Sequence, residues 1–211
     1  MSEYSQFRYV TPGPSNGDTG AALAAKLVRL VSGLDQVRSI CDLGCGNGYL
    51  SGLLAGPGLQ VVGVDASESG VAIAKAALGE RGEVVCARID PGLPGIMGDA
   101  RFDAVISSDV IEHMYLPRDL LQCARELLNP GGWLVLGTPY HGYLKNLALG
   151  ILDRWDAHHS VDWDGGHIKF FSVRTLSRMV TEAGFEVQRF DYFGRLPWLW
   201  MNMICVARAK D

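Results

Sequence analysis

The stretch Asp42–Gly48 (DLGCGNG) decides the fold, because it lies directly between an apolar, strand-like run and a helix-like segment. Gly44, Gly46 and Gly48 allow a sharp backbone turn and let a ligand approach the chain without a Cβ in the way. Such a turn is typical of the first strand-to-helix connection of a doubly wound sheet, where small ligands bind. Taken alone, it also fits a plain tight turn.

Strand-like and helix-like segments alternate on both sides of this loop. The predicted strands are Val37–Leu43, Gln60–Asp65, Val84–Ile89, Phe102–Ser107, Trp133–Thr138, Phe185–Tyr192 and Trp198–Ala207. The predicted helices are Thr19–Leu34, Tyr49–Ala55, Ser67–Leu78, Arg118–Leu128 and Val173–Ala183, with Gly184 just past the last of them. The pattern predicts the α/β class, with a doubly wound, mostly parallel sheet of about seven strands. No helix separates the last two strands, so we expect them to form an antiparallel pair at the sheet edge.

The length of 211 residues favours one domain with a full core. We expect a flexible N-terminal arm over residues 1–18, because this stretch mixes Pro, Gly, Ser and Asn. A single domain is expected over residues 19–211, with an insertion at about 139–166. With 48% hydrophobic and 20% charged residues, the composition is that of a globular chain and excludes a disordered one.

Charge and cysteine content exclude several classes of partner. The net charge is −4 and the basic residues are scattered, which disfavours nucleic acid as a partner. The N-terminus does not resemble a secretory signal, and the apolar stretch Leu196–Ala207 is too short to span a bilayer. Five cysteines without a Cys-x-x-Cys pair indicate reduced thiols, and neither a disulfide framework nor a zinc site. We therefore expect a soluble, cytoplasmic protein.

Two carboxylates near the glycine loop narrow the choice of ligand. Asp65 ends the strand after the loop, where a carboxylate can accept both hydroxyls of a ribose; alternatively it caps the following helix. Asp42 places an acid beside the loop, which suits an ammonium group better than a phosphate. Tyr49 stands where a dinucleotide-binding motif has its third glycine. A cationic nucleoside amino acid therefore fits better than a pyrophosphate.

At this point the chain resembles a known family. The segments DLGCGNG, VVGVDAS, FDAVISSDVIEHM and LLNPGGWLVLGTP resemble, in this order, the motifs of class I S-adenosylmethionine (SAM)-dependent methyltransferases, over about Ser39–Pro139. The segment Gly166–Phe185 resembles, more loosely, the small-molecule branch that includes the ubiquinone-biosynthesis O-methyltransferases.

The resemblance implies roles for individual residues around SAM and its product S-adenosylhomocysteine (SAH). It implies that Gly44, Cys45 and Gly46 approach the methionine moiety, and that Asp42 orients its ammonium group. It implies that Asp65 holds the ribose hydroxyls. The remaining implied cofactor residues are Ala66, Ile89 and Asp90 at the adenine, and Ser107 and Asp109 near the sulfonium and the acceptor. Ile89 and Asp90 also fit an ordinary loop before Pro91.

Histidines are the candidate bases for an acceptor that must lose a proton. The candidate catalytic residues are His113, which follows the fourth strand, His141, which follows the fifth, and His167. Each also fits a structural role in a turn or loop. A concentration of acids and histidines occurs at Asp156, His158, His159, Asp162, Asp164 and His167, but its spacing matches no ligand pattern. We therefore expect a solvated loop there and no metal.

The insertion has an apolar stripe at helical spacing: Leu144, Leu147, Ala148, Ile151, Leu152 and Trp155. With Trp198–Met201, this stripe suggests a lid over the acceptor site and an aromatic, prenylated or lipid-linked acceptor. The alternative is that both segments complete the core.

The sequence favours methyl transfer to a small molecule at a hydroxyl oxygen. The Asn/Asp-Pro-Pro-Tyr motif expected of nucleic-acid or protein amide methyltransferases is absent from its place, which reads SSDV. A nitrogen acceptor and a sugar hydroxyl remain open. Two alternatives from other classes are a SAM-binding regulatory or interaction protein without transfer activity and a nicotinamide-dependent reductase. The oligomeric state stays open.

Overall fold

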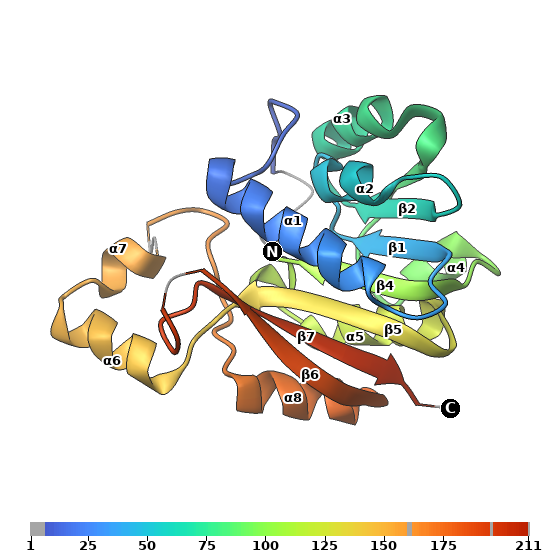
Figure 1. The fold of residues 1–211 in the computed structure, drawn as a ribbon. Helices are drawn as coiled ribbons and strands as arrows, with labels where there is room; N and C mark the ends of the chain where they lie inside the picture. The colour runs from blue at the N-terminus through green and yellow to red at the C-terminus, as the bar shows by residue number, and fades with distance from the viewer. Residues whose placement is uncertain (1–6, 160–161, 195, 211) are drawn as a thin grey trace.

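Seven strands form one mixed sheet in the order β3-β2-β1-β4-β5-β7-β6 (Figure 1). The computed structural model describes residues 7–159, 162–194 and 196–210. The strands are β1 (Ser39–Leu43), β2 (Gln60–Asp65), β3 (Glu83–Cys86), β4 (Phe102–Ser108), β5 (Leu128–Pro139), β6 (Phe185–Phe193) and β7 (Asn202–Ala209). The first five are parallel, whereas β7 runs antiparallel to both β5 and β6. This confirms the predicted doubly wound sheet with an antiparallel C-terminal edge pair.

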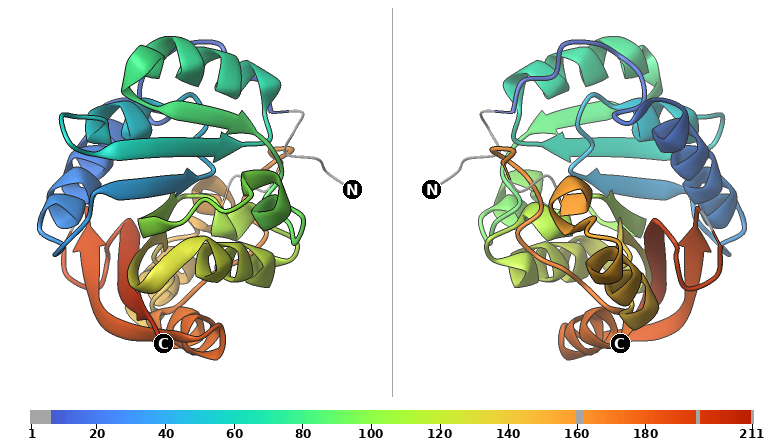
Figure 2. Two further views of the ribbon diagram at one scale, coloured as in Figure 1. Left: turned by 90° about the vertical axis from the view of Figure 1, so that its right-hand side faces the viewer. Right: turned by 90° about the vertical axis from the view of Figure 1, so that its left-hand side faces the viewer.

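Helices cover both faces of the sheet (Figure 2). They are α1 (Gly17–Ser32), α2 (Tyr49–Leu54), α3 (Glu68–Leu78), α4 (Leu93–Met97), α5 (Pro117–Leu127), α6 (Tyr143–Ile151), α7 (Trp155–His159) and α8 (Val173–Glu182), with 3₁₀ turns at Gly79–Arg81 and Ile111–His113. Neighbouring residues of β1 point to opposite faces. Ile40 therefore packs in the core beneath α1, whereas Cys41 packs in the larger core beneath α5 and α8.

The strand order places a crevice at the carboxyl ends of β1 and β4. The chain leaves β1 toward β2 on one side, and β4 lies on the other side, so the connections diverge at this point. Open α/β sheets bind ligands at such a switch point. The glycine loop after β1 and the residues after β4 therefore share one site.

Three strand boundaries differ from those expected by three residues or more. β5 begins at Leu128, because Leu128 pairs with Phe102 of β4 and an irregularity separates this pair from the next one, between Trp133 and Ala104. β3 ends already at Cys86. β7 begins at Asn202, because the apolar residues before it form a turn whose Trp200 ring stacks on Tyr192, 3.9 Å between centroids.

The insertion at 139–166 holds α6 and α7, which lie beyond the carboxyl ends of the parallel strands, on the left in Figure 1. Residues 160–161 of this insertion and residues 1–6 of the predicted arm lie outside the described residues. In the described part of the chain, no helix combines the length and the apolar character that crossing a membrane requires.

Candidate functional site

The glycine loop turns back tightly beneath the residues that follow β4. Gly44 has a φ of 83°, and a Cβ on it would lie 2.3 Å from Cγ2 of Val110. Its amide and that of Cys45 both donate to the carbonyl of Val64, at 2.8 and 3.0 Å. Only glycine fits at position 44, because both the backbone conformation and the close neighbour exclude a side chain.

Asp65 joins this loop to the end of β2. Its Oδ2 accepts a hydrogen bond from the Gly46 amide and its Oδ1 one from the Ser67 amide, both at 2.8 Å. Burial raises the pKa of this carboxyl, and the bonds from Ser67 and Gly46 partly offset the shift. The cap of α3 is Ser67, whose hydroxyl accepts from the Gly70 amide. Asp65 is thus a neighbour of the cap, and its side chain orients the loop.

Asp42 is buried beneath the same loop, with 2% of its surface exposed. Burial raises the pKa of its carboxyl to about 6, and the hydroxyl of Ser51, which donates to Oδ2 at 2.6 Å, opposes that shift. Asp42 therefore supports the loop from below and adds negative potential beneath it.

The N-terminal arm crosses the loop. The amide of Tyr9 donates to Oγ of Ser69 at 3.0 Å, and the carbonyl of Phe7 accepts from the hydroxyl of Ser67 at 2.5 Å. Nδ2 of Asn47 donates to the carbonyls of Thr11 and Gly13. A Cβ on Gly46 would lie 2.7 Å from the Tyr9 hydroxyl. This tyrosine was not among the predicted site residues.

The predicted adenine residues follow β3. Ile89 is half-buried against the core, and Oδ1 of Asp90 accepts from the Gly92 amide at 2.8 Å. Arg88 lies 3.9 Å from Oδ2 of Asp90. Asp90 therefore stabilises the turn that leads into α4, as the structural alternative expects. Its adenine role stays a prediction.

After β4, the two predicted residues face different surroundings. Ser107 is fully buried, and its hydroxyl donates to the carbonyl of Leu43 at 2.7 Å, so it joins β4 to β1. Asp109 has a φ of 55°, and its Oδ1 accepts from Nδ2 of Asn202 at 2.6 Å. Burial raises the pKa of Asp109 to about 6.

Glu112 is a second buried acid beside Asp109. Its Oε2 accepts from the hydroxyl of Thr138 at 2.9 Å, and its Oε1 has no hydrogen-bond partner among the described residues. Burial and the neighbouring Asp109 raise its pKa well above the usual range. Burial of Glu112 therefore favours the protonated form of its carboxyl over the ionised form.

Two of the three candidate bases lie together. The rings of His113 and His167 are 4.8 Å apart between centroids. Nδ1 of His113 lies 3.0 Å from the carbonyl of Gly165, and only a protonated nitrogen can donate to it. The lone pair is then on Nε2. Burial lowers the pKa of His113, so its ring is neutral at neutral pH.

His141, the third candidate, belongs to another group. It is buried after β5, with its ring stacked on His159 at 5.3 Å and 25°. The prediction of a solvated loop is wrong for His159, which is buried, although Asp156, Asp162 and Asp164 are exposed. The ring leaves solvent because it packs against Trp155 and Phe170.

Among the described residues, two groups of side chains could share a metal ion, since the ligand atoms of each group lie within 4.8 Å of one another. One comprises Glu112, His113 and His167, and the other His141, His158 and His159. Neither fits a resident divalent ion well. In the first, burial and Asp109 raise the pKa of Glu112, which disfavours the ionised carboxylate that a metal needs, and the second lies beside the buried Lys145.

The apolar stripe of the insertion does not complete the core. The exposed side chains of α6 and the residues after it are Leu144, Leu147, Ile151, Leu152 and Trp155, and Trp198 is exposed near the C-terminus. Ile151, for example, is 73% exposed. The alternative in which both segments simply fill the core is therefore wrong for these residues.

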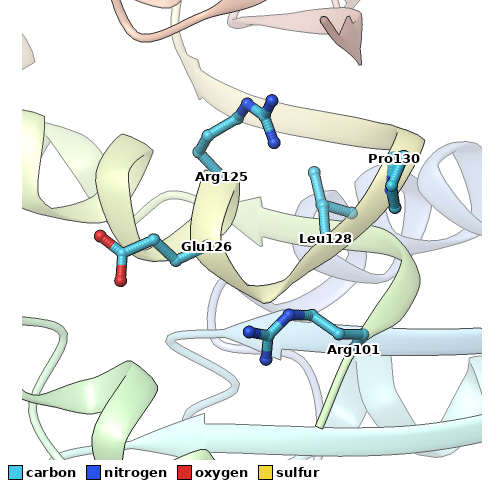
Figure 3. Close-up of a pocket in the computed structure, with 5 residues that line it drawn as sticks. All are labelled: Arg101, Arg125, Glu126, Leu128 and Pro130. Atoms are coloured by element: carbon cyan, nitrogen blue, oxygen red, sulfur yellow. The ribbon is translucent and has the colours of Figure 1, made fainter. Parts of the chain in front are cut away.

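A hollow of about 430 Å³ lies elsewhere on the molecule, lined by Arg101, Arg125, Glu126, Leu128 and Pro130 (Figure 3). These residues surround the starts of β4 and β5, opposite to the carboxyl ends of the strands. The hollow is therefore separate from the glycine loop.

Sequence reasoning missed Tyr9, Glu112, Thr138 and Asn202. An acid within the apolar segment after β4 is the one signal that could have singled out Glu112. Tyr9 and Asn202 reach the site only through contacts between distant parts of the chain.

The comparisons with known proteins agree with this geometry. A family model described as methyltransferase domain matches residues 16–189. The ubiquinone biosynthesis O-methyltransferase of Cereibacter sphaeroides is 29% identical over 168 residues, which cover 76% of this chain and 66% of that relative. The chain thus spans about two thirds of the length of that relative.

Two solved structures have the same fold. The magnesium protoporphyrin IX methyltransferase of Synechocystis PCC 6803 with bound SAH has a TM-score of 0.65 at 19% identity, covering 96% of this chain and 90% of that one. The N-methyltransferase NodS of Bradyrhizobium japonicum in complex with SAH has a TM-score of 0.66 at 16% identity, covering 93% and 90%.

Proposed function

The chain belongs to the methyltransferase domain family, and on that premise we propose that it transfers the methyl group of SAM to a hydroxyl oxygen of a small-molecule acceptor. The observation that carries the proposal is the hydrogen bond between Nδ1 of His113 and the carbonyl of Gly165, which places the ring N–H on Nδ1 and the lone pair on Nε2. Membership of this family excludes the nicotinamide-dependent reductase as an alternative.

The residues of the crevice fit SAM. The backbone of Gly44, Cys45 and Gly46 offers a surface without side chains for the methionine moiety, and Asp42 supplies the negative potential that its ammonium group requires. Asp65 retains lone pairs on both oxygens for the ribose hydroxyls. When bound, SAM supplies an electrophilic methyl group on its sulfonium.

The adenine side of the proposed site comprises Ala66, Ile89 and Asp90, and the sulfonium side comprises Ser107 and Asp109. We assign Ser107 an indirect role, since its hydroxyl is bonded to Leu43 and fixes the ends of β1 and β4. Asp109 follows β4 directly and is held in place by Asn202.

In the proposed reaction, Nε2 of neutral His113 would accept the proton of the acceptor hydroxyl; SAM, held by the glycine loop and Asp65, would supply the methyl group to that oxygen and leave as SAH. His167, whose ring lies against His113 and whose pKa is lowered to about 4 by burial and by His113, keeps that surface uncharged. The raised pKa of Glu112 disfavours a second carboxylate that would compete for the proton. The main contribution of the protein is alignment of acceptor and methyl group in a site from which water is excluded.

We propose residues 19–211 as one methyltransferase domain, with the insertion at 139–166 as its lid. The exposed apolar side chains of α6 support this, because a single domain gains nothing from leaving them in water. An acceptor with an aromatic or lipid-like part would cover them.

The test uses SAM with a labelled methyl group and a metabolite extract of bacterial cells. We expect label in a small molecule, in a bond that withstands the conditions that cleave methyl esters, together with SAH binding in calorimetry. Binding of SAH without label in any molecule would favour the alternative of a SAM-binding protein without transfer activity. Label on nitrogen would overturn the assignment to oxygen.

A further inference from the structure

The ring of Tyr9, in the N-terminal arm, occupies a slot between two glycines, and we call this place the tyrosine slot. A Cβ on Gly46, in the glycine loop, would lie 2.7 Å from the hydroxyl oxygen of Tyr9. A Cβ on Gly70, in the first turn of α3, would lie 2.8 Å from Cδ2 of the same ring. Because the ring packs directly on both backbones, a side chain at either glycine would displace it.

Hydrogen bonds to the loop and to α3 fix the arm over the slot. The amide of Tyr9 donates to Oγ of Ser69 at 3.0 Å. The hydroxyl of Ser67 donates to the carbonyl of Phe7. Nδ2 of Asn47 donates to two carbonyls farther along the arm, at 3.1 and 2.8 Å. These bonds hold the backbone of the arm and do not use the hydroxyl of Tyr9.

That hydroxyl makes no hydrogen bond within the described ranges 7–159, 162–194 and 196–210. Burial and the neighbouring Asp65, Cys45 and Asp42 raise the pKa of Tyr9 above its usual range, so the group keeps its proton. A protonated phenol is an O–H donor. A half-buried donor without an acceptor in the protein points to an acceptor that a ligand or solvent supplies.

The glycine loop itself offers few donors to a negative group. Of the five amides between residues 44 and 48, four already donate within the chain: those of Gly44, Cys45, Gly46 and Gly48. The carboxyls of Asp42 and Asp65 lie beside the loop and repel an anion when they are ionised. The methionine moiety of SAM carries both an ammonium and a carboxylate group. The acids suit the ammonium group, so the carboxylate needs a donor from another part of the chain.

We propose that Tyr9 is a further cofactor-binding residue, whose hydroxyl donates a hydrogen bond to the carboxylate of the methionine moiety of SAM. This inference rests on the proposed function and adds a residue to the same site. Asp42 then serves the ammonium group and Tyr9 the carboxylate, with the backbone of the glycine loop between them. The arm thereby favours nucleosides that carry a complete amino acid over those that lack its carboxylate.

The test compares two ligands that differ only in this carboxylate. They are SAH and its decarboxylated analogue, which keeps the amine and the nucleoside, and calorimetry measures the affinity of the full chain for each. We expect Tyr9→Phe to weaken SAH binding about tenfold or more, through the loss of one hydrogen bond to a charged group. The affinity for the analogue should change by less than about twofold, because the analogue has no acceptor for that bond.

Other variants separate the hydroxyl from the ring. Tyr9→Phe should fold like the wild type in thermal unfolding, because its ring still fills the tyrosine slot. Tyr9→Ala also loses the packing on Gly46 and Gly70, so it should weaken binding of both ligands. Tyr115→Phe is the matched control at a tyrosine that is 83% exposed, and it should leave both affinities unchanged.

Three results for Tyr9→Phe would overturn the proposal: unchanged SAH affinity, tighter SAH binding, or an equal loss of affinity for both ligands. Tighter binding would show that the tyrosine occupies the place of the cofactor, and an equal loss would show that it acts only through the loop. The wild type separates this inference from the proposed function. If the wild type binds neither ligand, the proposed function fails, whereas SAH binding that Tyr9→Phe leaves unchanged rejects the role of Tyr9 alone.

Discussion

The backbone amide of Gly46 donates a hydrogen bond to Oδ2 of Asp65, 2.8 Å away, and so ties the glycine loop after β1 to the end of β2. The other oxygen of that carboxylate accepts from the amide of Ser67. One side chain thus sets the position of the loop and of the following helix, and still has lone pairs that face the crevice.

Replacing this carboxylate should affect ligand binding more than folding. For Asp65→Ala we expect SAH affinity to fall by about 1–3 kcal/mol, from lost charge-assisted hydrogen bonds. Thermal stability should change little, because relief from a buried charge offsets the lost backbone bonds. Calorimetry measures the SAH affinity, and thermal unfolding measures the stability. Asp99→Ala, at an exposed acid, is the control, and an unchanged SAH dissociation constant would contradict the assignment.

The buried Asp42 should make stability depend on pH. Its folded pKa of about 6 lies above the usual aspartate value of 3.8, so the folded state holds the proton more tightly, and stability is lost as pH rises toward 6. The loss is about 3 kcal/mol. Asp42→Asn should match the wild type near pH 4 and exceed it near pH 8 in urea unfolding. If the difference in unfolding free energy between Asp42→Asn and the wild type were the same at every pH from 4 to 8, the pKa of Asp42 would not be shifted.

Gly44 and Gly52 should respond oppositely to alanine. Gly44→Ala should destabilise the chain and abolish SAH binding, because its Cβ would meet Val110 in a left-handed backbone conformation. Gly52→Ala should stabilise by about 0.5–1 kcal/mol, since Gly52 lies in α2 with open space around it. Adding Val110→Ala to Gly44→Ala should recover part of the loss. Equal effects of both alanines on unfolding would refute this account of the loop.

His113 should be needed for transfer and not for cofactor binding. His113→Asn keeps a donor near the place of Nδ1 for the Gly165 carbonyl but removes the base, so labelled-methyl transfer should fall about 10²–10⁴-fold. SAH affinity and thermal stability should stay close to the wild type. His113→Gln instead loses the loop contact and should lower stability as well. Full transfer activity in the asparagine variant would exclude this histidine as the base.

The exposed apolar stripe of α6 should affect the binding of the acceptor and not the stability of the fold. Leu147→Asp and Ile151→Asp should each weaken binding of the acceptor, because the acceptor would cover both side chains. We expect each to raise the KM of the labelled acceptor by a factor that corresponds to about 1.5–3 kcal/mol of lost binding free energy. Stability should hold, because both positions are exposed. Leu53→Asp, at an exposed leucine of α2, is the matched control. An unchanged KM in a folded variant would rule out the lid.

Most of the fold could be predicted because continuous apolar runs such as Gln60–Asp65 occur only where a strand is buried on both faces. The start of β5 could not be predicted, since Asn129 and Pro130 are typical of turns, and the strand extends back over them only because Leu128 pairs with Phe102 of β4. The start of β7 was misplaced, because an apolar side chain such as Trp200 gives the same signal in a turn that packs on Tyr192 as in a strand.

The site could be predicted where local motifs define it. The turn at Gly44 and the carboxylate of Asp65 are local features of the chain. The bonds of Glu112 with Thr138 and of Asp109 with Asn202 join distant segments, so no local pattern predicts them. Likewise, the burial of His159 depends on Trp155 and Phe170, which pack around it only in the folded chain.

The path of the N-terminal segment across Gly46 and Ser67 has a practical consequence for purification and labelling. A fusion partner or affinity tag attached ahead of Phe7 pulls on the carbonyl that Ser67 holds and on Tyr9, which touches the loop. Tags and fluorophores belong at the carboxyl end instead, past the last strand at Ala209 and far from the crevice (Figure 1).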